Sequence, residues 1–259
     1  MQRTFSYILL ITWVFLIFAC KTHYTNIHAD GLNIRLSGSI HRVDNQVVGV
    51  YMPYKKILDK DMLKVIAVTE EEMVKEKPES NLTNFLADLL LEQGTKEAKS
   101  AGFKLTPDIS YFNYGGIRTF LPEGEITVGK IYELIPFENK MVYLHLSGKQ
   151  IQIFLNDIAE KGGDILGGVR FVIADQKAKN IIINGEPLNM ESNYWLVTND
   201  YVASGGDNLE ILTKRNEFIE SEKKIRDVII AHLMAMQNKG KAISEKTDER
   251  IRYEKKTVF

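Results

Sequence analysis

The residues best suited to ligand chemistry form a short loop, Asn113-Tyr114-Gly115-Gly116-Ile117-Arg118, directly after a β-like run. Two adjacent glycines let a backbone approach a ligand closely, and neighbouring N–H groups in such a turn can point at an anion. The guanidinium of Arg118 can add two parallel hydrogen bonds to a phosphate or carboxylate. Taken alone, the hexapeptide is more typical of a tight turn with a solvated charge, so binding needs support from elsewhere in the chain.

Two further segments supply side chains of complementary chemistry. Pro136-Phe137-Glu138-Asn139 places an aromatic and an amide just before a β-like run, although Phe137 alone could equally be a core residue. The segment from Asn199 to Asp207 follows another such run and brackets the pair Gly205-Gly206 with Tyr201 and Asp207. A nucleoside monophosphate site needs these groups: flat faces that stack on the base, an amide and a carboxylate for the base edge and ribose hydroxyls, and a guanidinium for the phosphate.

The elements that must position these residues can be predicted from periodicity. Three segments carry apolar residues at helical spacing: one from Ser80 as N-cap to about Gly94 or Gly102, one at 151–158 and one at 225–236. Five runs predict strands: Ile109–Phe112, Met141–Leu146, Val169–Ile173, Ile181–Ile183 and Tyr194–Thr198. Because strands and helices interleave without strict alternation, we expect an α/β or α+β domain, and assign an α/β fold with a mixed sheet and flanking helices.

In their order and spacing, these segments resemble the C-terminal domain of the 5'-nucleotidase family, which includes periplasmic UDP-sugar hydrolase and ecto-5'-nucleotidase. The similarity begins at Glu79-Ser80-Asn81-Leu82-Thr83-Asn84-Phe85-Leu86-Ala87-Asp88, close to the family's ESNLGNLIAD helix. It continues through the Asn-Gly-Gly-Ile-Arg-like loop, Pro136-Phe137 and the Gly-Gly-Asp turn, and covers about residues 47 to 238.

The resemblance implies a role for each site residue. A base would lie between Phe137 and Tyr201, with Asn113 and Asn139 at the base, Arg118 at phosphate or ribose, and Asp207 at the ribose hydroxyls. The backbone of Gly115, Gly116 and Gly206 would complete the substrate-binding site.

Two positions depart from the family pattern. Tyr201 stands where members usually have Phe, which adds a hydroxyl that needs a partner. The stretch 75–78, Lys-Glu-Lys-Pro, offers lysines where members commonly carry an arginine, and a lysine is a point charge instead of a bidentate fork.

In full-length members, the resemblance implies, a separate N-terminal metallophosphoesterase domain holds two metal ions in Asp-x-His, Gly-Asn-His and Gly-His-x-His motifs. None of the five histidines of this chain stands in such a motif. We therefore assign no catalytic residue, no metal ligand and no bound cofactor to the chain, and expect the divalent metal pair on a partner. Gly124 to Lys130 resembles a phosphate-binding loop, but Ile131 replaces the magnesium-binding Ser or Thr, so a helix from Thr127 to Leu134 is expected instead.

The N-terminus has the composition of an export signal. Arg3 precedes an apolar run from Phe5 to Ala19, too short to span a bilayer as a helix, and the only cysteine, Cys20, ends a lipobox-like stretch. Lipidation of Cys20 would anchor the protein in a bacterial cell envelope, while an ordinary signal peptide is the alternative. We expect a signal peptide and acylated cysteine at 1–20, a tether and short β-like lead-in at 21–46, the domain at 47–240, and a polar tail at 241–259.

The leading hypothesis is the nucleotide-binding half of a split 5'-nucleotidase, completed by a separate metallophosphoesterase chain. The alternatives are a stand-alone envelope lipoprotein that binds nucleotides or nucleosides, and a domain that keeps the fold without the ligand. A formal net charge of −1 argues against nucleic acid as a partner. The sequence leaves open whether the chain takes part in catalysis and which nucleotide it prefers.

Overall fold

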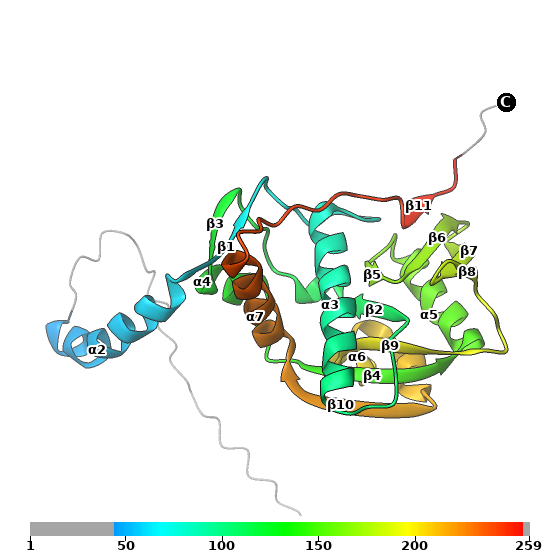
Figure 1. Cartoon of the computed structure of the whole chain (residues 1–259), viewed down its shortest axis with the longest axis horizontal. Coiled ribbons are helices and arrows are strands. Elements are labelled where there is room, and N and C mark those ends of the chain that lie inside the picture. The colour runs from blue at the N-terminus through cyan, green and yellow to red at the C-terminus, as the bar shows by residue number, and fades with distance from the viewer. Residues whose placement is uncertain (1–43, 256–259) are drawn as a thin grey trace, which may run out of the picture. The chain divides into compact units, whose positions relative to one another are not determined.

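A mixed five-stranded sheet in the order β10-β4-β9-β2-β5 lies at the centre of the fold (Figure 1). The computed structural model describes residues 44–255. The strands of the sheet are β2 (Ile109–Phe112), β4 (Lys140–Ser147), β5 (Ile165–Gly167), β9 (Asn193–Asn199) and β10 (Glu217–Lys224). β2 and β9 run parallel, whereas the other neighbouring pairs are antiparallel, so the expected mixed sheet is confirmed.

The described residues also form two smaller sheets and six α-helices. A four-stranded sheet has the order β11-β6-β7-β8, and β1 pairs with β3. Their strands are β1 (Val65–Thr69), β3 (Gly124–Thr127), β6 (Val169–Ala174), β7 (Lys177–Ile183), β8 (Glu186–Pro187) and β11 (Ile251–Tyr253). The α-helices are α2 (Asn45–Met62), α3 (Asn81–Ser100), α4 (Val128–Leu134), α5 (Gly148–Glu160), α6 (Asp200–Ala203) and α7 (Ile225–Asn238). Single 3₁₀ turns are η1 (Tyr114–Gly116), η2 (Gly206–Asn208) and η3 (Glu210–Lys214).

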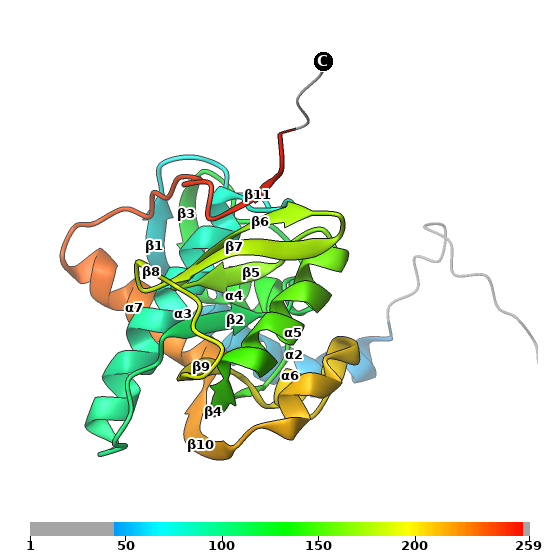
Figure 2. The same ribbon diagram turned by 90° about the vertical axis from the view of Figure 1, so that its right-hand side faces the viewer.

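Strand β4 of the five-stranded sheet is buried on both faces. Along β4, Met141 and Tyr143 pack into one core with residues of α3 and α7, while Val142 and Leu144 pack into a second core with α5. α5 contacts β4 and β9 of this sheet and β7 of the four-stranded sheet, and Figure 2 shows it beside both. This packing fixes the strand ends from which the predicted site loops emerge.

The predicted helices and strands are present. Ser80 caps α3: its hydroxyl accepts the Thr83 N–H, and the Thr83 hydroxyl accepts the Ser80 N–H. α3 ends at Ser100, before Gly102 with φ 75°, so Gly94 lies inside the helix, where a Cβ would come within 2.9 Å of the Val197 side chain. The helix expected from Thr127 to Leu134 is α4, and strand β3 directly precedes it.

The structure differs from expectation at both ends of the domain. A helix, α2, begins at Asn45, within the expected β-like lead-in. At the other end, the expected polar tail packs on the domain as far as Tyr253: Ile243 and Ile251 are buried, and β11 pairs with β6. The expected signal peptide, Cys20 and most of the tether lie outside the described residues. No helix within residues 44–255 is long and apolar enough to cross a bilayer.

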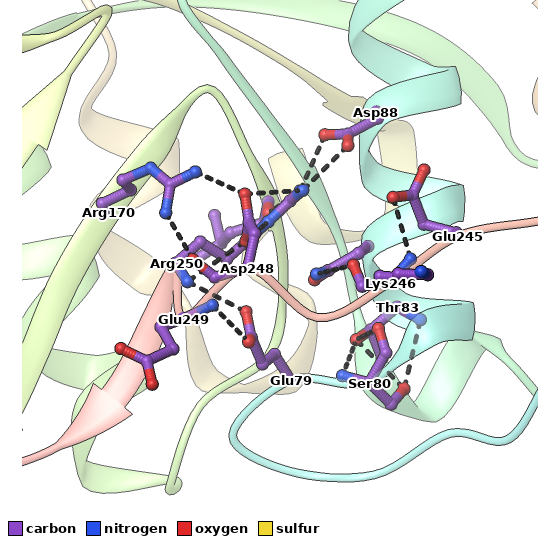
Figure 3. A network of polar contacts seen from close by, with 12 residues as sticks. Glu79, Ser80, Thr83, Asp88, Arg170, Glu245, Lys246, Asp248, Glu249 and Arg250 are labelled. Carbon is purple, nitrogen blue, oxygen red and sulfur yellow. Dashed lines mark hydrogen bonds and ion pairs between the residues drawn. The ribbon is translucent and has the colours of Figure 1, made fainter.

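Charged side chains explain why this polar segment is ordered. Arg250, 7% exposed, donates to both carboxylate oxygens of Asp88 on α3 at 2.7 and 2.8 Å, and to Asp248 at 2.9 Å (Figure 3). The Glu79 carboxylate accepts the backbone N–H groups of Glu249 and Arg250. The segment is therefore held by charge-assisted hydrogen bonds, which leave no apolar periodicity in the sequence.

Strand pairing brings the three predicted site segments to one edge of the sheet. β2 and β9 are parallel, so the residues that follow them, Asn113 and Asp200, emerge at the same edge. β4 runs antiparallel to β9 with Met141 opposite Asn199, so the segment that precedes β4 arrives there as well.

A buried carboxyl lies beneath the glycine loop. Asp164, 6% exposed, accepts a hydrogen bond from the Tyr111 hydroxyl at 3.1 Å and from the Ile165 N–H at 2.9 Å. Burial raises the pKa of Asp164 from 3.8 to about 6, although hydrogen bonds from Ile165, Tyr111 and the Tyr114 N–H oppose the shift. At a pH between these two values, the Asp164 carboxyl therefore keeps a proton in the folded protein that it has already released in the unfolded chain.

This linkage predicts a pH-dependent stability. Because the pKa of Asp164 is higher in the folded state, the free energy of unfolding falls as pH rises from about 4 to about 6, by on the order of 2–3 kcal/mol. Asp164→Asn should remove this contribution, so that the variant gains stability relative to the wild type across that window in urea titrations. The control is Asp175→Asn on the surface, where Lys179 holds the pKa of the carboxyl below its ordinary value. Parallel curves for wild type and Asp164→Asn would contradict the assignment.

Candidate functional site

A pocket of about 280 Å³ lies where the three segments meet. It is lined by eight of the nine substrate-binding residues expected from the sequence: Asn113, Gly115, Gly116, Arg118, Phe137, Asn139, Tyr201 and Asp207. The ninth, Gly206, supports the pocket from behind, because a Cβ there would lie 2.5 Å from Cε1 of the Tyr201 ring. Any larger residue at position 206 would displace this aromatic wall.

The two aromatic rings of the pocket remain accessible. Phe137 is 43% exposed and Tyr201 is 48% exposed, so neither serves as an ordinary core residue. Large apolar rings that stay exposed beside polar groups are typical of ligand sites, where a planar ligand can cover them. The guanidinium of Arg118 lies 5.9 Å from the centroid of the Phe137 ring.

All polar groups of Asp207 contact the protein. Its Oδ2 accepts from Asn113 Nδ2 at 2.8 Å, and its Oδ1 accepts from the Tyr201 hydroxyl at 3.0 Å. Its N–H donates to the same hydroxyl at 3.3 Å, and its carbonyl accepts from Lys161 Nζ at 2.7 Å. Asp207 has φ 55°, in the left-handed region, so these contacts hold a backbone conformation that few non-glycine residues adopt.

Asn113 connects this carboxylate to the core. The side chain is 4% exposed, and its Oδ1 accepts from Nδ2 of the fully buried Asn199 at 3.1 Å. Asn199 in turn caps α6, because its Oδ1 accepts the Val202 N–H at 3.0 Å. The amide of Asn113 thus orients Asp207, and the sequence did not predict this contact between the two side chains. The second N–H of the amide is left for a ligand.

The glycine loop forms η1, in which there is no room for a side chain at Gly116, whereas Gly115 has ordinary contact distances. A Cβ at Gly116 would lie 2.8 Å from Asn113 Oδ1, and one at Gly115 would point at the carboxylate of Asp207 from 3.9 Å. The N–H groups of Gly116 and Ile117, however, donate to carbonyls within the loop, at Asn113 and Tyr114. The expectation that neighbouring N–H groups point at an anion is therefore wrong for these two, and Arg118, which also donates to the Gly115 carbonyl at 3.1 Å, is the cation of the pocket lining.

Lys75 and Arg226 brace the site loops, and the sequence pointed to neither role. Lys75 Nζ donates to the carbonyls of Tyr114 at 2.9 Å and Ile117 at 2.5 Å, and it lies 4.0 Å from the Tyr114 ring centroid. Burial, followed by the charge of Arg118, lowers the pKa of Lys75. Lys75, one of the two lysines in the stretch 75–78, is thus committed to the carbonyls of the glycine loop.

Arg226 plays the same part for the segment that carries Phe137. This side chain is 3% exposed and donates to the Pro136 carbonyl and to Glu138 Oε1, both at 3.1 Å. It lies near the start of α7, where an arginine would ordinarily be taken for a solvated helix residue. Lys161 holds the Asp207 turn in the same way. Each of the three site segments is therefore held by a hydrogen bond from a lysine or arginine side chain.

Across residues 44–255, no three or more His, Cys, Asp and Glu side chains are grouped in a way that could hold a metal ion.

Comparison with known proteins agrees with this architecture. Residues 65–214 match the family described as 5'-nucleotidase, C-terminal domain. A 5'-nucleotidase of Vibrio vulnificus is 29% identical over 119 residues, which are 44% of this chain and 22% of the relative. The trifunctional nucleotide phosphoesterase protein of Bacillus subtilis is 28% identical over 190 residues, 67% of this chain and 12% of the relative.

Solved structures show the same fold. A 5'-nucleotidase precursor from Thermus thermophilus superposes with a TM-score of 0.66 at 26% identity, over 81% of this chain and 43% of that protein. A putative 5'-nucleotidase from Staphylococcus aureus gives a TM-score of 0.63 at 18% identity, over 85% of this chain and 46% of that one. The chain thus spans less than half the length of each of these relatives. Since the match covers more than half of this sequence, the chain belongs to the 5'-nucleotidase family, of which it contains the C-terminal domain.

Proposed function

We propose that this chain is the nucleotide-binding half of a split 5'-nucleotidase. The observation that carries the proposal is the pocket between Phe137 and Tyr201, with the immobilised carboxylate of Asp207 beside it. A purine or pyrimidine ring would stack between the two aromatic side chains, which is worth about 1–3 kcal/mol per base in comparable sites. Ribose hydroxyls would donate to Asp207, Asn139 would lie at the base edge, and Arg118 would reach the phosphate or the ribose.

The hydrolytic step would take place on a separate metallophosphoesterase chain. What supports this is the match to the C-terminal domain together with the lack of the family's histidine motifs in the sequence. The described residues do not fit a metal pair, so we assign no step of phosphate ester hydrolysis to side chains of this chain. In this proposal the chain presents the nucleotide, and a metal pair held by the partner would supply an activated water and charge stabilisation for the leaving oxygen.

Export and lipid anchoring belong to the same proposal. The apolar run before Cys20 and the lipobox-like sequence favour attachment to the bacterial cell envelope through an acylated cysteine. Such an anchor would keep the chain on a membrane surface, where it could meet an exported partner.

The alternative function is a stand-alone envelope protein that binds nucleotides or nucleosides without catalysis. It is favoured by the accessible rings and the pre-oriented Asp207, because these suffice for binding without any second chain.

Nucleotide binding can be measured by calorimetric titration with AMP, UDP-glucose and adenosine. Phe137→Ala and Asp207→Ala should each weaken binding by about tenfold or more, because one removes a stacking face and the other the acceptor for ribose hydroxyls. The matched control is Phe218→Ala, which removes a similarly exposed ring, 41% accessible, that packs on Arg215 outside the pocket lining. Absence of binding by the wild type, or unchanged affinity in both pocket variants, would refute the site.

A partner chain can be tested by copurification from the native envelope, followed by a phosphatase assay with added divalent metal. The split-enzyme proposal predicts a co-eluting metallophosphoesterase and hydrolysis of AMP that depends on both the metal and this chain. If the chain elutes alone and no activity accompanies it, while calorimetry still shows binding, the stand-alone function is the better description.

A further inference from the structure

The hydroxyl of Tyr201 makes contacts that its role as a stacking ring does not require. It donates to Asp207 Oδ1 at 3.0 Å and accepts from the Asp207 N–H at 3.3 Å, so one hydroxyl bridges both ends of the same residue. Because a phenol has one O–H, its only donor is used on Asp207 and none remains for a ligand. The oxygen of this hydroxyl already accepts the Asp207 N–H, so we assign its influence on a ligand hydroxyl to the carboxylate that it holds.

The carboxylate of Asp207 retains capacity for two further hydrogen bonds. Each carboxylate oxygen can accept about two, and the protein supplies one to each: Tyr201 to Oδ1 and Asn113 to Oδ2. One acceptor position on each oxygen is left, and two adjacent hydroxyl groups can fill such a pair. Because Tyr201 and Asn113 each donate to one oxygen, rotation of the carboxylate would break at least one of these hydrogen bonds.

The backbone around Asp207 makes this bracing necessary. Gly205 at φ 92°, Asp207 at 55° and Asn208 at 60° all lie in the left-handed region, which is unfavourable for the two residues that carry a Cβ. The Tyr201 ring also packs closely on Gly206, where a Cβ could not fit. Ring, turn and carboxylate consequently form one unit.

We propose that the Tyr201 hydroxyl is a specificity-determining positioning group, which makes the pocket prefer ligands with two adjacent hydroxyls, ribonucleosides, over ligands with one, 2'-deoxyribonucleosides. The proposal rests on the nucleoside-binding function above and deepens it. The hydroxyl holds Oδ1 while Asn113 holds Oδ2, and with both oxygens fixed the carboxylate favours a two-point contact over a one-point contact. A deoxynucleoside uses a single oxygen, which Asn113 alone can hold in place.

The test is calorimetric titration of the full mature chain with adenosine, 2'-deoxyadenosine and adenine, for wild type and Tyr201→Phe. The substitution keeps the stacking ring and removes only the hydroxyl, and the affinity for adenine, which has no sugar, measures any change in stacking itself. The ratio of adenosine to deoxyadenosine affinity should fall by about 3- to 10-fold, as expected for the loss of one hydrogen bond. In an Asp207→Asn background, Tyr201→Phe should not change the ratio further, because both act through the same group.

Tyr194→Phe is the matched control. It removes a hydroxyl at the opposite end of β9, which accepts the Asn189 N–H at 3.0 Å, and it should leave all three affinities unchanged. The proposal is wrong, while the binding function stands, if Tyr201→Phe keeps the wild-type ratio of adenosine to deoxyadenosine affinity. The same holds if the wild type shows no preference for the ribonucleoside. If the wild type binds neither nucleoside, the binding function and this proposal both fail.

Discussion

The site depends on the way three strands pair at one edge of the central sheet. β2 and β9 are parallel neighbours, and β4 runs antiparallel to β9 with Met141 opposite Asn199. Two strands therefore end, and one begins, at the same place, which gathers segments about 90 residues apart in sequence into one pocket. Burial of alternate β4 residues in two separate cores fixes this register, because a shift by one residue would exchange the two faces.

Rigidity in the pocket comes from polar contacts made within the protein. Lys75, Lys161 and Arg226 all donate to backbone carbonyls of the site segments. These cations stiffen the loops instead of presenting charge to a ligand. Asp207 is held likewise by Asn113 and Tyr201. A ligand then meets groups that are already oriented, so little conformational entropy is lost on binding. The two rings stay accessible because their polar neighbours, and not a covering core, hold them in place.

The sequence predicted the parts of the structure whose physical cause is local. Helical periodicity located α3, α5 and α7, and the hydroxyl of Ser80 predicted the start of α3. The pocket residues could be named because each of the three segments adjoins a predicted strand and because together they resemble one family. Contacts between distant residues could not be predicted: Lys75 on the glycine loop, Arg226 on the Phe137 segment, and Arg250 on Asp88. β10 was missed because its sequence, Glu-Phe-Ile-Glu-Ser-Glu-Lys-Lys, is charged, as is common on an edge strand.

The central claim is that this domain holds a nucleoside between Phe137 and Tyr201 with its sugar on Asp207. A crystal structure of the chain grown with adenosine tests this most directly. The account predicts the adenine ring stacked between the two aromatic side chains, and both ribose hydroxyls within hydrogen-bonding distance of the Asp207 carboxylate, with the Tyr201 and Asn113 contacts retained. Adenosine bound elsewhere, or in this pocket with its ribose turned away from Asp207, would contradict it.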